Sequence, residues 1–232
     1  MIRFRTMSLF VLNLPPLFNI NVGGVAEVSS PGLHKEIAVF QTWDRKNSVP
    51  EDAVLFTGSS SIRMWTTREA FPDFPVINRG FGGSHISDVL YFSDKIVLPY
   101  QPKVIVLYAG DNDIAAGKTP KRVFNDFQEL AGPVGRNLPE TRIVFISIRC
   151  SPSRFPLWPM MDEANSMIKR FCEENERLVY ADCATPLLRP DKKPDPEFFA
   201  EDRLHLSKKG YQTWTKVLTP IIQDALKPDK EK

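Results

Sequence analysis

Cysteine and histidine are scarce in this sequence, with three of each among 232 residues. Cys150, Cys172 and Cys183 show no CxxC spacing, so at most one disulfide could form and a disulfide framework is excluded. Free cysteines are among the most buried residues in proteins, and we therefore expect all three in the core. Because the cysteines and histidines never cluster, the sequence predicts no metal site.

The sequence also lacks a strong charge imbalance and a long apolar run. Its 30 basic and 28 acidic residues give a net charge of +2. No basic stripe is visible, which argues against nucleic acid as a partner. An apolar stretch at residues 7–18 is broken by Asn13, Pro15 and Pro16, and it is too short to span a membrane.

Residues 1–26 have the features of a secretory signal peptide. Arg3 and Arg5 precede the apolar stretch, the segment contains no acidic residue, and Gly24 and Ala26 are small residues suited to cleavage after Ala26. We therefore expect export, to the periplasm or the medium; the alternative is a disordered N-terminus on a cytoplasmic protein. In both cases residues 27–232 are expected to form one domain of ordinary size.

One histidine has an acidic residue one turn before it. Histidine can take and return a proton near neutral pH. In Asp202-Arg203-Leu204-His205 the carboxylate can reach the imidazole and fix its tautomer, as in a Ser-His-Asp triad. A surface Asp and His that share a turn by chance would show the same spacing, so the pair alone does not indicate catalysis.

Short apolar runs alternate with helical stripes along the rest of the sequence. Strands are expected at 54–57, 76–78, 104–108, 142–148 and 178–181. Helices are expected at 31–46, 86–97, from 119, through 164–171, and after Ser207, which would cap the last one. This alternation predicts an α/β fold with helices on both faces of a parallel sheet.

Polar loops follow four of these strands, after Thr57, Asn78, Tyr108 and Ala181. The carboxyl ends of parallel strands lie along one edge of the sheet, and ligands bind there. We therefore expect the four loops to converge on one site.

The first of these loops contains three serines, in Gly58-Ser59-Ser60-Ser61. A serine at a strand-to-helix turn lies where backbone N–H groups and the helix dipole favour an oxyanion. The same run could instead only cap the helix. The α/β-hydrolase pattern G-x-S-x-G is not matched, because Ile62 occupies its last position, and no phosphate-binding P-loop pattern occurs.

Two other loops could supply donors to an oxyanion. Gly82-Gly83 permits close approach of the backbone to a ligand, or forms a plain turn. Asn112 could donate from its side-chain amide, or form an Asx-turn. Asp111 and Asp113 flank it, but two carboxylates without a further acidic cluster are weak grounds for a metal.

Together the four loops resemble those of the SGNH hydrolases, also called GDSL-type esterases or lipases, which place Ser, Gly, Asn and His in four blocks in this order. The resemblance extends from about residue 53 to the final helix, and it is greatest to the branch of platelet-activating-factor acetylhydrolase subunits and microbial acylesterases. The blocks here are Phe56-Thr57-Gly58-Ser59-Ser60-Ser61-Ile62-Arg63-Met64-Trp65, Asn78-Arg79-Gly80-Phe81-Gly82-Gly83, Gly110-Asp111-Asn112-Asp113 and Asp202-Arg203-Leu204-His205.

The resemblance implies a flavodoxin-like three-layer α/β/α sandwich with five parallel strands. It also implies that Ser60 is the nucleophile, that His205 is the general base and then acid, and that Asp202 orients His205. The oxyanion hole would consist of the Ser60 and Gly83 amides and the Asn112 side chain.

One position departs from the family pattern, because Ser59 stands where the family usually has Asp. Ser60 is therefore identified by register within three adjacent serines, and Ser59 or Ser61 as the nucleophile is the alternative.

The expected activity is hydrolysis of short-chain, acetyl-type carboxylic esters through an acyl-enzyme, with no cofactor and no metal. A carbohydrate O-deacetylase is the specific expectation, with a small-molecule or carbohydrate ester as partner. A thioesterase, a lysophospholipase, an O-acetyl transferase or a non-catalytic binding domain on the same fold is the alternative. Arg154 and Trp158, in the proline-rich loop 151–159, are expected to contact the substrate or to pack as a lid. The sequence does not indicate an oligomeric state.

Overall fold

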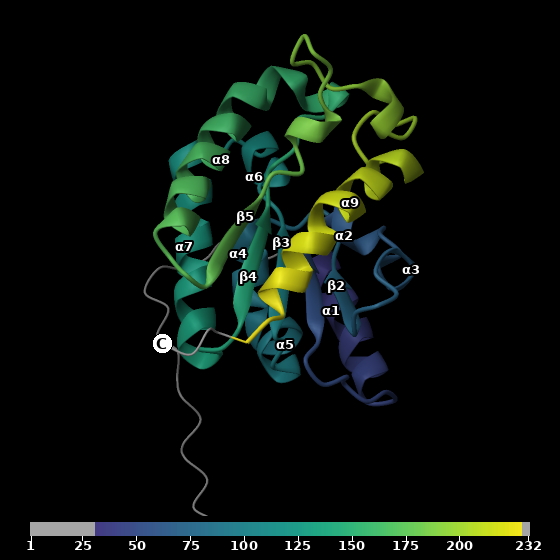
Figure 1. Cartoon of the computed structure of the whole chain (residues 1–232), viewed down its shortest axis with the longest axis vertical. Helices are drawn as coiled ribbons and strands as arrows, with labels where there is room; N and C mark the ends of the chain where they lie inside the picture. Colours follow the sequence, from purple (N-terminus) through teal and green to yellow (C-terminus); the bar gives the residue numbers. More distant parts are fainter. Residues whose placement is uncertain (1–30, 229–232) are drawn as a thin grey trace, which may run out of the picture.

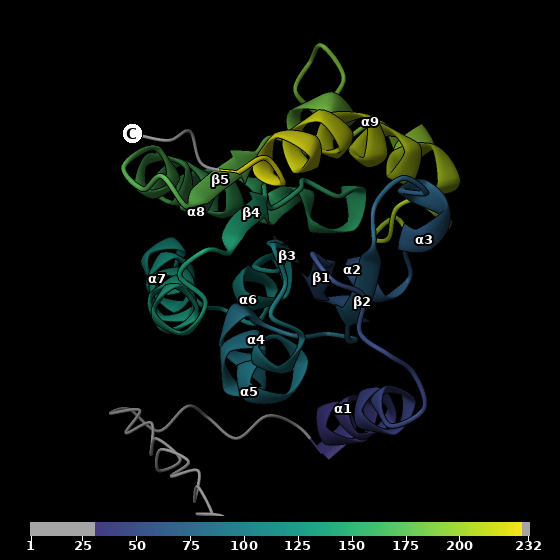
Figure 2. The same cartoon turned by 60° about the horizontal axis from the view of Figure 1, so that its bottom comes forward.

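The computed structural model describes residues 31–228. A parallel sheet of five strands forms its centre, with the strand order β2-β1-β3-β4-β5. This order is flavodoxin-like. The predicted three-layer α/β/α fold with five parallel strands is therefore confirmed (Figures 1 and 2). The strands are β1 (Val54–Gly58), β2 (Val76–Gly80), β3 (Val104–Tyr108), β4 (Arg142–Ile146) and β5 (Leu178–Ala181).

Helices cover both faces of the sheet. The α-helices are α1 (Pro31–Asp44), α2 (Ser60–Arg63), α3 (Thr67–Ala70), α4 (Ile86–Tyr91), α5 (Ser93–Ile96), α6 (Asp111–Ala115), α7 (Pro120–Asn137), α8 (Trp158–Glu173) and α9 (Lys208–Ala225). Short 3₁₀ segments are η1 (Leu98–Tyr100), η2 (Pro152–Leu157), η3 (Thr185–Leu187) and η4 (Pro196–Phe198). One core cluster joins α1, α4, α5, α7 and α8 to one face of the sheet, and another joins α2 and α9 to the opposite face. Figure 2 shows α9 and α1 on opposite sides of the strands.

The two core clusters follow from the strand sequences. Successive side chains of a strand point to opposite faces. In β3, Ile105 and Leu107 belong to the first cluster, while Val104, Val106 and Tyr108 belong to the second. Both faces of β3 are therefore buried, which explains why its sequence is continuously apolar.

The fourth strand is shorter than the sequence indicates. It was expected to reach residue 148, but β4 ends at Ile146 because β5, its neighbour, ends at Ala181 and offers no further ladder. The backbone of Ile148 instead pairs with the Asn165 side chain of α8, whose oxygen accepts from the Ile148 N–H and whose nitrogen donates to the Ile148 carbonyl, both at 2.8 Å. The Asn165 side chain thus provides the hydrogen bonds that the buried N–H and carbonyl of Ile148 would otherwise form with a neighbouring strand.

The helix expected over residues 86–97 is also divided, into α4 and α5, and η1 follows them. The division falls at Phe92, which ends α4 and precedes α5. Phe92 and Ile96 are both fully buried. The two side chains are four residues apart and share one face of the segment, so both point into the core across the break. The predicted cap of the last helix is confirmed, because Ser207 accepts from the Gly210 N–H at 3.2 Å at the start of α9. Helix α9 continues through Pro220.

The predicted signal peptide, residues 1–26, lies outside the described residues, so export of the chain stays a prediction. Within residues 31–228, no helix combines the length and the apolar character that crossing a bilayer requires.

Candidate active site

The turn between β1 and α2 presents one of the three serines. Gly58 has a φ of +123°, and a Cβ atom there would lie 1.9 Å from the Tyr108 carbonyl oxygen, so only glycine fits. The Ser59 N–H donates to that same carbonyl at 2.9 Å, which fixes the turn against β3. Ser59 and Ser61 are each 1 % exposed, whereas Ser60 is partly exposed.

Ser60 has a histidine partner. Its Oγ atom lies 2.9 Å from Nε2 of His205. Within the described residues, the Oγ atoms of Ser59 and Ser61 have no hydrogen-bond partner. Of the three adjacent serines, the one that alignment with the family pattern identifies as the nucleophile, Ser60, is thus the one that faces His205.

The histidine is in turn held by the acidic residue that precedes it. The Nδ1 atom of His205 lies 2.6 Å from Oδ2 of Asp202. The other carboxylate oxygen of Asp202, Oδ1, accepts the backbone N–H groups of Leu204 and His205, each at 2.9 Å. Every partner of the carboxylate is thus a donor, which orients Asp202 and presents Oδ2 to the ring.

These contacts keep Asp202 ionised. The hydrogen bond with His205, followed by the bond from the Leu204 N–H, lowers the pKa of Asp202 from its ordinary value to about 2. Donors to the charged form of a carboxyl group lower its pKa in this way. Because the Asp202 side chain is 49 % exposed, solvent screens the pair, and its role is to orient the ring more than to stabilise the fold.

The loop after β2 brings a second backbone amide to this edge. The Phe81 N–H donates to the Gly58 carbonyl at 2.9 Å, which ties the loop to the serine turn. Gly83 has a φ of +72° and is exposed. Within residues 31–228, neither the Ser60 N–H nor the Gly83 N–H donates a hydrogen bond, so both remain free for a ligand.

The side-chain amide of Asn112 lies beside this loop. Asn112 is the second residue of α6, and its Nδ2 donates to the Ser84 carbonyl at 3.2 Å. One of the two amide protons therefore remains for a further acceptor. The structure thus brings Gly83 and Asn112 into neighbouring positions, as the sequence predicts.

Arg154 and Trp158, expected to contact the substrate or to pack as a lid, lie in η2 and at the start of α8. Arg154 belongs to η2, and its guanidinium group donates to Oδ2 of Asp111 at 2.8 Å and to Oδ1 of Asn112 at 2.9 Å. Trp158 begins α8 and packs against a core cluster. Contact of either residue with a substrate stays a prediction.

Two functional candidates and one ion pair were missed by the sequence reasoning. Arg149, which is fully buried, donates at 2.8 Å to the carbonyl of Leu204, the residue before His205. Glu36 of α1 accepts the Gly82 N–H at 3.1 Å. Asp111, which the sequence places beside Asn112, pairs with Arg154. No local motif marks these contacts, because each joins residues that are distant in sequence.

The two carboxylates that flank Asn112 bind cations of the protein itself. Asp111 pairs with Arg154, and Oδ1 of Asp113 lies 2.8 Å from Nζ of Lys118. In the described part of the chain, no group of three His, Cys, Asp or Glu residues could hold a metal ion. The expectation of buried cysteines is confirmed, since Cys150, Cys172 and Cys183 are all buried and free.

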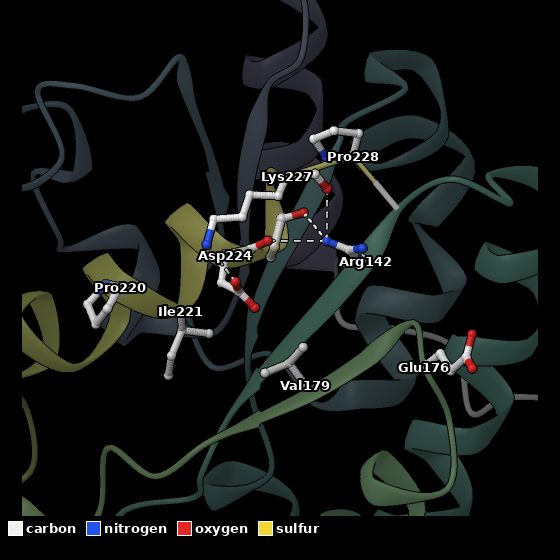
Figure 3. A pocket seen from close by; sticks show the side chains of 9 residues that line it. Arg142, Glu176, Val179, Pro220, Ile221, Asp224, Lys227 and Pro228 are labelled. Atoms are coloured by element: carbon white, nitrogen blue, oxygen red, sulfur yellow. Dashed lines mark hydrogen bonds and ion pairs between the residues drawn. The ribbon is translucent and has the colours of Figure 1, made fainter. Parts of the chain in front are cut away.

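A hollow in the surface lies at the opposite end of the sheet (Figure 3). It is lined by Arg142, Glu176, Val179, Pro220, Ile221, Asp224, Ala225, Lys227 and Pro228. Arg142, the first residue of β4, donates to the carbonyls of Asp224, Ala225 and Lys227 at the end of α9. A cation suits a helix C-terminus. Arg142 therefore stabilises the end of α9, and no serine, cysteine or histidine is among the residues that line this hollow.

Comparisons with known proteins bear on the family and on the fold of this chain. The sequence profile of the GDSL-like lipase/acylhydrolase family matches residues 58–213. The sequence matches no curated protein.

Several solved structures share the fold. One is assigned as a platelet activating factor from Streptococcus pneumonia, with a TM-score of 0.72, 24 % identity, and coverage of 82 % of this chain and 94 % of that chain. A GDSL-like lipase from Bacteroides thetaiotaomicron has a TM-score of 0.70 and 20 % identity, covering 82 % and 98 % of the two chains. An acetylxylan esterase from Geobacillus stearothermophilus, a catalytic mutant, has a TM-score of 0.61 and 15 % identity, covering 79 % and 99 %. At these identities the likeness shows the fold alone.

The matched segment begins at Gly58, the start of the serine turn, and extends into α9. It thus includes the four loops that meet at the carboxyl edge of the sheet and covers more than half of the chain. The chain belongs to the GDSL-like lipase/acylhydrolase family, a family of ester-hydrolysing enzymes.

Proposed function

We propose that this protein is a serine esterase that hydrolyses short-chain, acetyl-type carboxylic esters through an acyl-enzyme. The observation that carries the proposal is the hydrogen-bonded chain from Ser60 Oγ to His205 Nε2, at 2.9 Å, and from His205 Nδ1 to Asp202 Oδ2, at 2.6 Å. Both distances are within the reach needed for proton transfer and for orientation of the base.

In the first half of the reaction, Ser60 Oγ attacks the ester carbonyl while Nε2 of His205 takes its proton. The carbonyl oxygen becomes an oxyanion, which the N–H groups of Ser60 and Gly83 and the Asn112 amide would bind. The bond to the alcohol oxygen then breaks, and His205 returns its proton to the departing alcohol. An acetyl ester on Ser60 remains.

In the second half, water takes the place of Ser60. His205 removes a proton from the water as it attacks the acyl carbonyl, and the same donors hold the oxyanion. Collapse releases the carboxylic acid, and the proton on His205 returns to Ser60. Every step uses residues of this chain, and none calls for a cofactor or a metal.

For the substrate we propose an acetylated carbohydrate. Support comes from the shared fold with an acetylxylan esterase, at 15 % identity. The partly exposed Ser60 and the exposed Gly83 also suit a broad alcohol with a small acyl group. Under this proposal Trp158 and Phe155 flank the alcohol side of the site, Phe155 being 38 % exposed.

The proposal is tested by labelling the protein with a fluorophosphonate and mapping the adduct by mass spectrometry. We expect one adduct, on Ser60, and a parallel loss of aryl-acetate turnover. A panel of aryl esters from acetyl to octanoyl, acetylated xylo-oligosaccharides, thioesters and lysophospholipids then identifies the substrate. Preference for thioesters or lysophospholipids would replace the carbohydrate proposal, and transfer of acetyl to an added alcohol in place of water would indicate a transferase. Absence of both adduct and turnover would contradict the serine mechanism itself.

The pH dependence of activity follows from the lowered pKa of Asp202. A carboxyl group with a pKa of about 2 is ionised wherever the protein can be assayed, and its contribution to stability is lost only as the pH falls below about 4 toward 2. We therefore expect kcat/KM for an aryl acetate to show no loss from protonation of Asp202 above about pH 4, because the carboxylate stays ionised there and keeps His205 oriented. A step in kcat/KM above about pH 4 that Asp202→Asn abolishes would contradict the assignment.

A further inference from the structure

The Asn112 amide can serve as an oxyanion donor only in one of its two orientations. Rotation by 180° about the last side-chain bond exchanges its oxygen and its NH₂ group, which have nearly the same shape. In one orientation a proton faces the ligand, and in the other a carbonyl oxygen does. An oxyanion hole built on asparagine therefore needs a neighbour that distinguishes the two ends.

Arg154 supplies that distinction. Its Nη2 donates to Oδ1 of Asn112 at 2.9 Å, while Nδ2 of Asn112 donates to the Ser84 carbonyl at 3.2 Å. A guanidinium group has donors and no acceptor. Rotation of the amide would set NH₂ against guanidinium and oxygen against the Ser84 carbonyl, and both contacts would become repulsive.

The guanidinium group is itself held rigidly. Its Nη1 donates at 2.8 Å to Oδ2 of Asp111, whose side chain is 6 % exposed. The same Asp111 oxygen lies 3.7 Å from Nη1 of the buried Arg149. One buried carboxylate thus anchors two arginines, and ion pairs removed from water in this way are geometrically specific.

The same cluster reaches the loop that carries the base. Arg149 donates to the Leu204 carbonyl at 2.8 Å, and the Ser153 N–H, next to Arg154, donates to the Arg203 carbonyl at 3.0 Å. The η2 segment is therefore fixed both to the His205 loop and to the Asn112 amide. The Arg154 side chain is only 19 % exposed. The two terminal nitrogens of its guanidinium group donate to Asp111 and to Asn112.

We propose that Arg154 is a positioning residue that locks the Asn112 amide with its NH₂ group toward the oxyanion, and that it acts through Asn112 without contacting the substrate. This inference rests on the proposed esterase function. It also assigns Arg154 a different role from the substrate contact that its loop suggests in the sequence.

A double-mutant cycle on kcat for an aryl acetate tests the proposal. Asn112→Ala is expected to lower kcat by about 10²–10³-fold, as loss of one oxyanion donor does elsewhere. Arg154→Met is expected to lower kcat by about tenfold or more with little change in KM, because the amide is then free to rotate. In the Asn112→Ala background the same Arg154→Met change is expected to alter kcat by less than about threefold, since coupled residues are not additive.

Two further variants separate positioning from stability. Arg154→Lys keeps a cation for Asp111 but cannot also hold Asn112, so kcat is expected to fall while the melting temperature stays near that of the unchanged protein. Arg122→Met is the matched control. Arg122 also pairs with a buried carboxylate that retains a second cation, Asp126 with Lys118. Lys118 in turn pairs with Asp113, but Arg122 itself forms no hydrogen bond or ion pair with Asn112 or the His205 loop in the described part of the chain. We expect Arg122→Met to leave kcat unchanged.

The outcomes are distinguishable. A rise in KM with constant kcat in Arg154→Met, or an equal loss of kcat in the presence and absence of Asn112, would overturn the inference and indicate direct substrate contact. Full activity of Arg154→Lys would also overturn it. If Ser60→Ala and Asn112→Ala both retain esterase activity, the proposed function fails and not the positioning role alone.

Discussion

Ser60→Ala is expected to lower kcat for ester hydrolysis by about 10⁵–10⁶-fold, a loss comparable with that on removal of the nucleophile from other serine hydrolases. Alanine retains the fold of the turn, because the Ser60 side chain is partly exposed and, among the described residues, its Oγ has one hydrogen-bond partner, His205. What disappears is the atom that forms the acyl-enzyme. Stopped-flow or steady-state turnover of an aryl acetate measures the loss, with circular dichroism as the control for folding.

The adjacent serines provide the matched controls. Ser59→Ala and Ser61→Ala each remove a hydroxyl that is 1 % exposed and that has no hydrogen-bond partner in the described part of the chain. Loss of a buried hydroxyl without a partner is nearly neutral or stabilising. Both variants are therefore expected to keep kcat within about threefold of the unchanged protein. A fluorophosphonate adduct on Ser59 or Ser61 in Ser60→Ala would contradict the assignment.

The structure also shows how this chain accommodates Ser59 at the position where the family usually has Asp. Its side chain lies in a buried position, and its N–H donates to the Tyr108 carbonyl. The orienting acid of the proposed triad is Asp202, from another loop, so the missing carboxylate at position 59 leaves the Ser60–His205–Asp202 chain intact. The departure therefore bears on the packing of the turn more than on proton transfer.

The parts of the fold that could be predicted are those encoded locally. A continuously apolar run such as residues 104–108 is both a strand and a central one, because both of its faces are covered. Strand ends in a parallel sheet share an edge, so the meeting of Ser60 with His205 followed from topology once five strands were expected. The residue at which a strand ends is set by its neighbouring strand. The end of β4 at Ile146 therefore could not be predicted from the local sequence.

The parts of the site that could not be predicted act across long separations. Glu36 lies in α1, before the segment that the family profile matches, and it accepts the Gly82 N–H next to the proposed oxyanion donor. Arg154 lies in a proline-rich loop, and its orientation toward Asn112 depends on how η2 packs against the His205 loop. Neither residue forms a local pattern with its partner, so only the folded chain reveals the contact.

Asp202→Asn is expected to lower kcat by about 10⁴-fold, the size of loss that a wrong histidine tautomer produces in a Ser-His-Asp enzyme. The reason lies in the two backbone donors that Asp202 already holds. The N–H groups of Leu204 and His205 both point at Oδ1. In the asparagine variant they select the amide oxygen, so the NH₂ group is turned toward Nδ1 of His205. Nδ1 must then accept, Nε2 carries the proton, and the ring can no longer take a proton from Ser60.

Asp202→Ala separates this tautomer effect from simple loss of the carboxylate. Because the Asp202 side chain is 49 % exposed, water can occupy the vacated position and accept from the Nδ1–H of His205. The alanine variant therefore retains access to the active tautomer, but it leaves the Leu204 and His205 N–H groups without their side-chain acceptor. We expect asparagine to be the more stable and less active variant, and alanine the less stable and more active one. Melting temperature and kcat measured on the same two proteins decide the matter: if alanine is the less active variant, the backbone donors do not control the ring, and Asp202 acts through its charge alone.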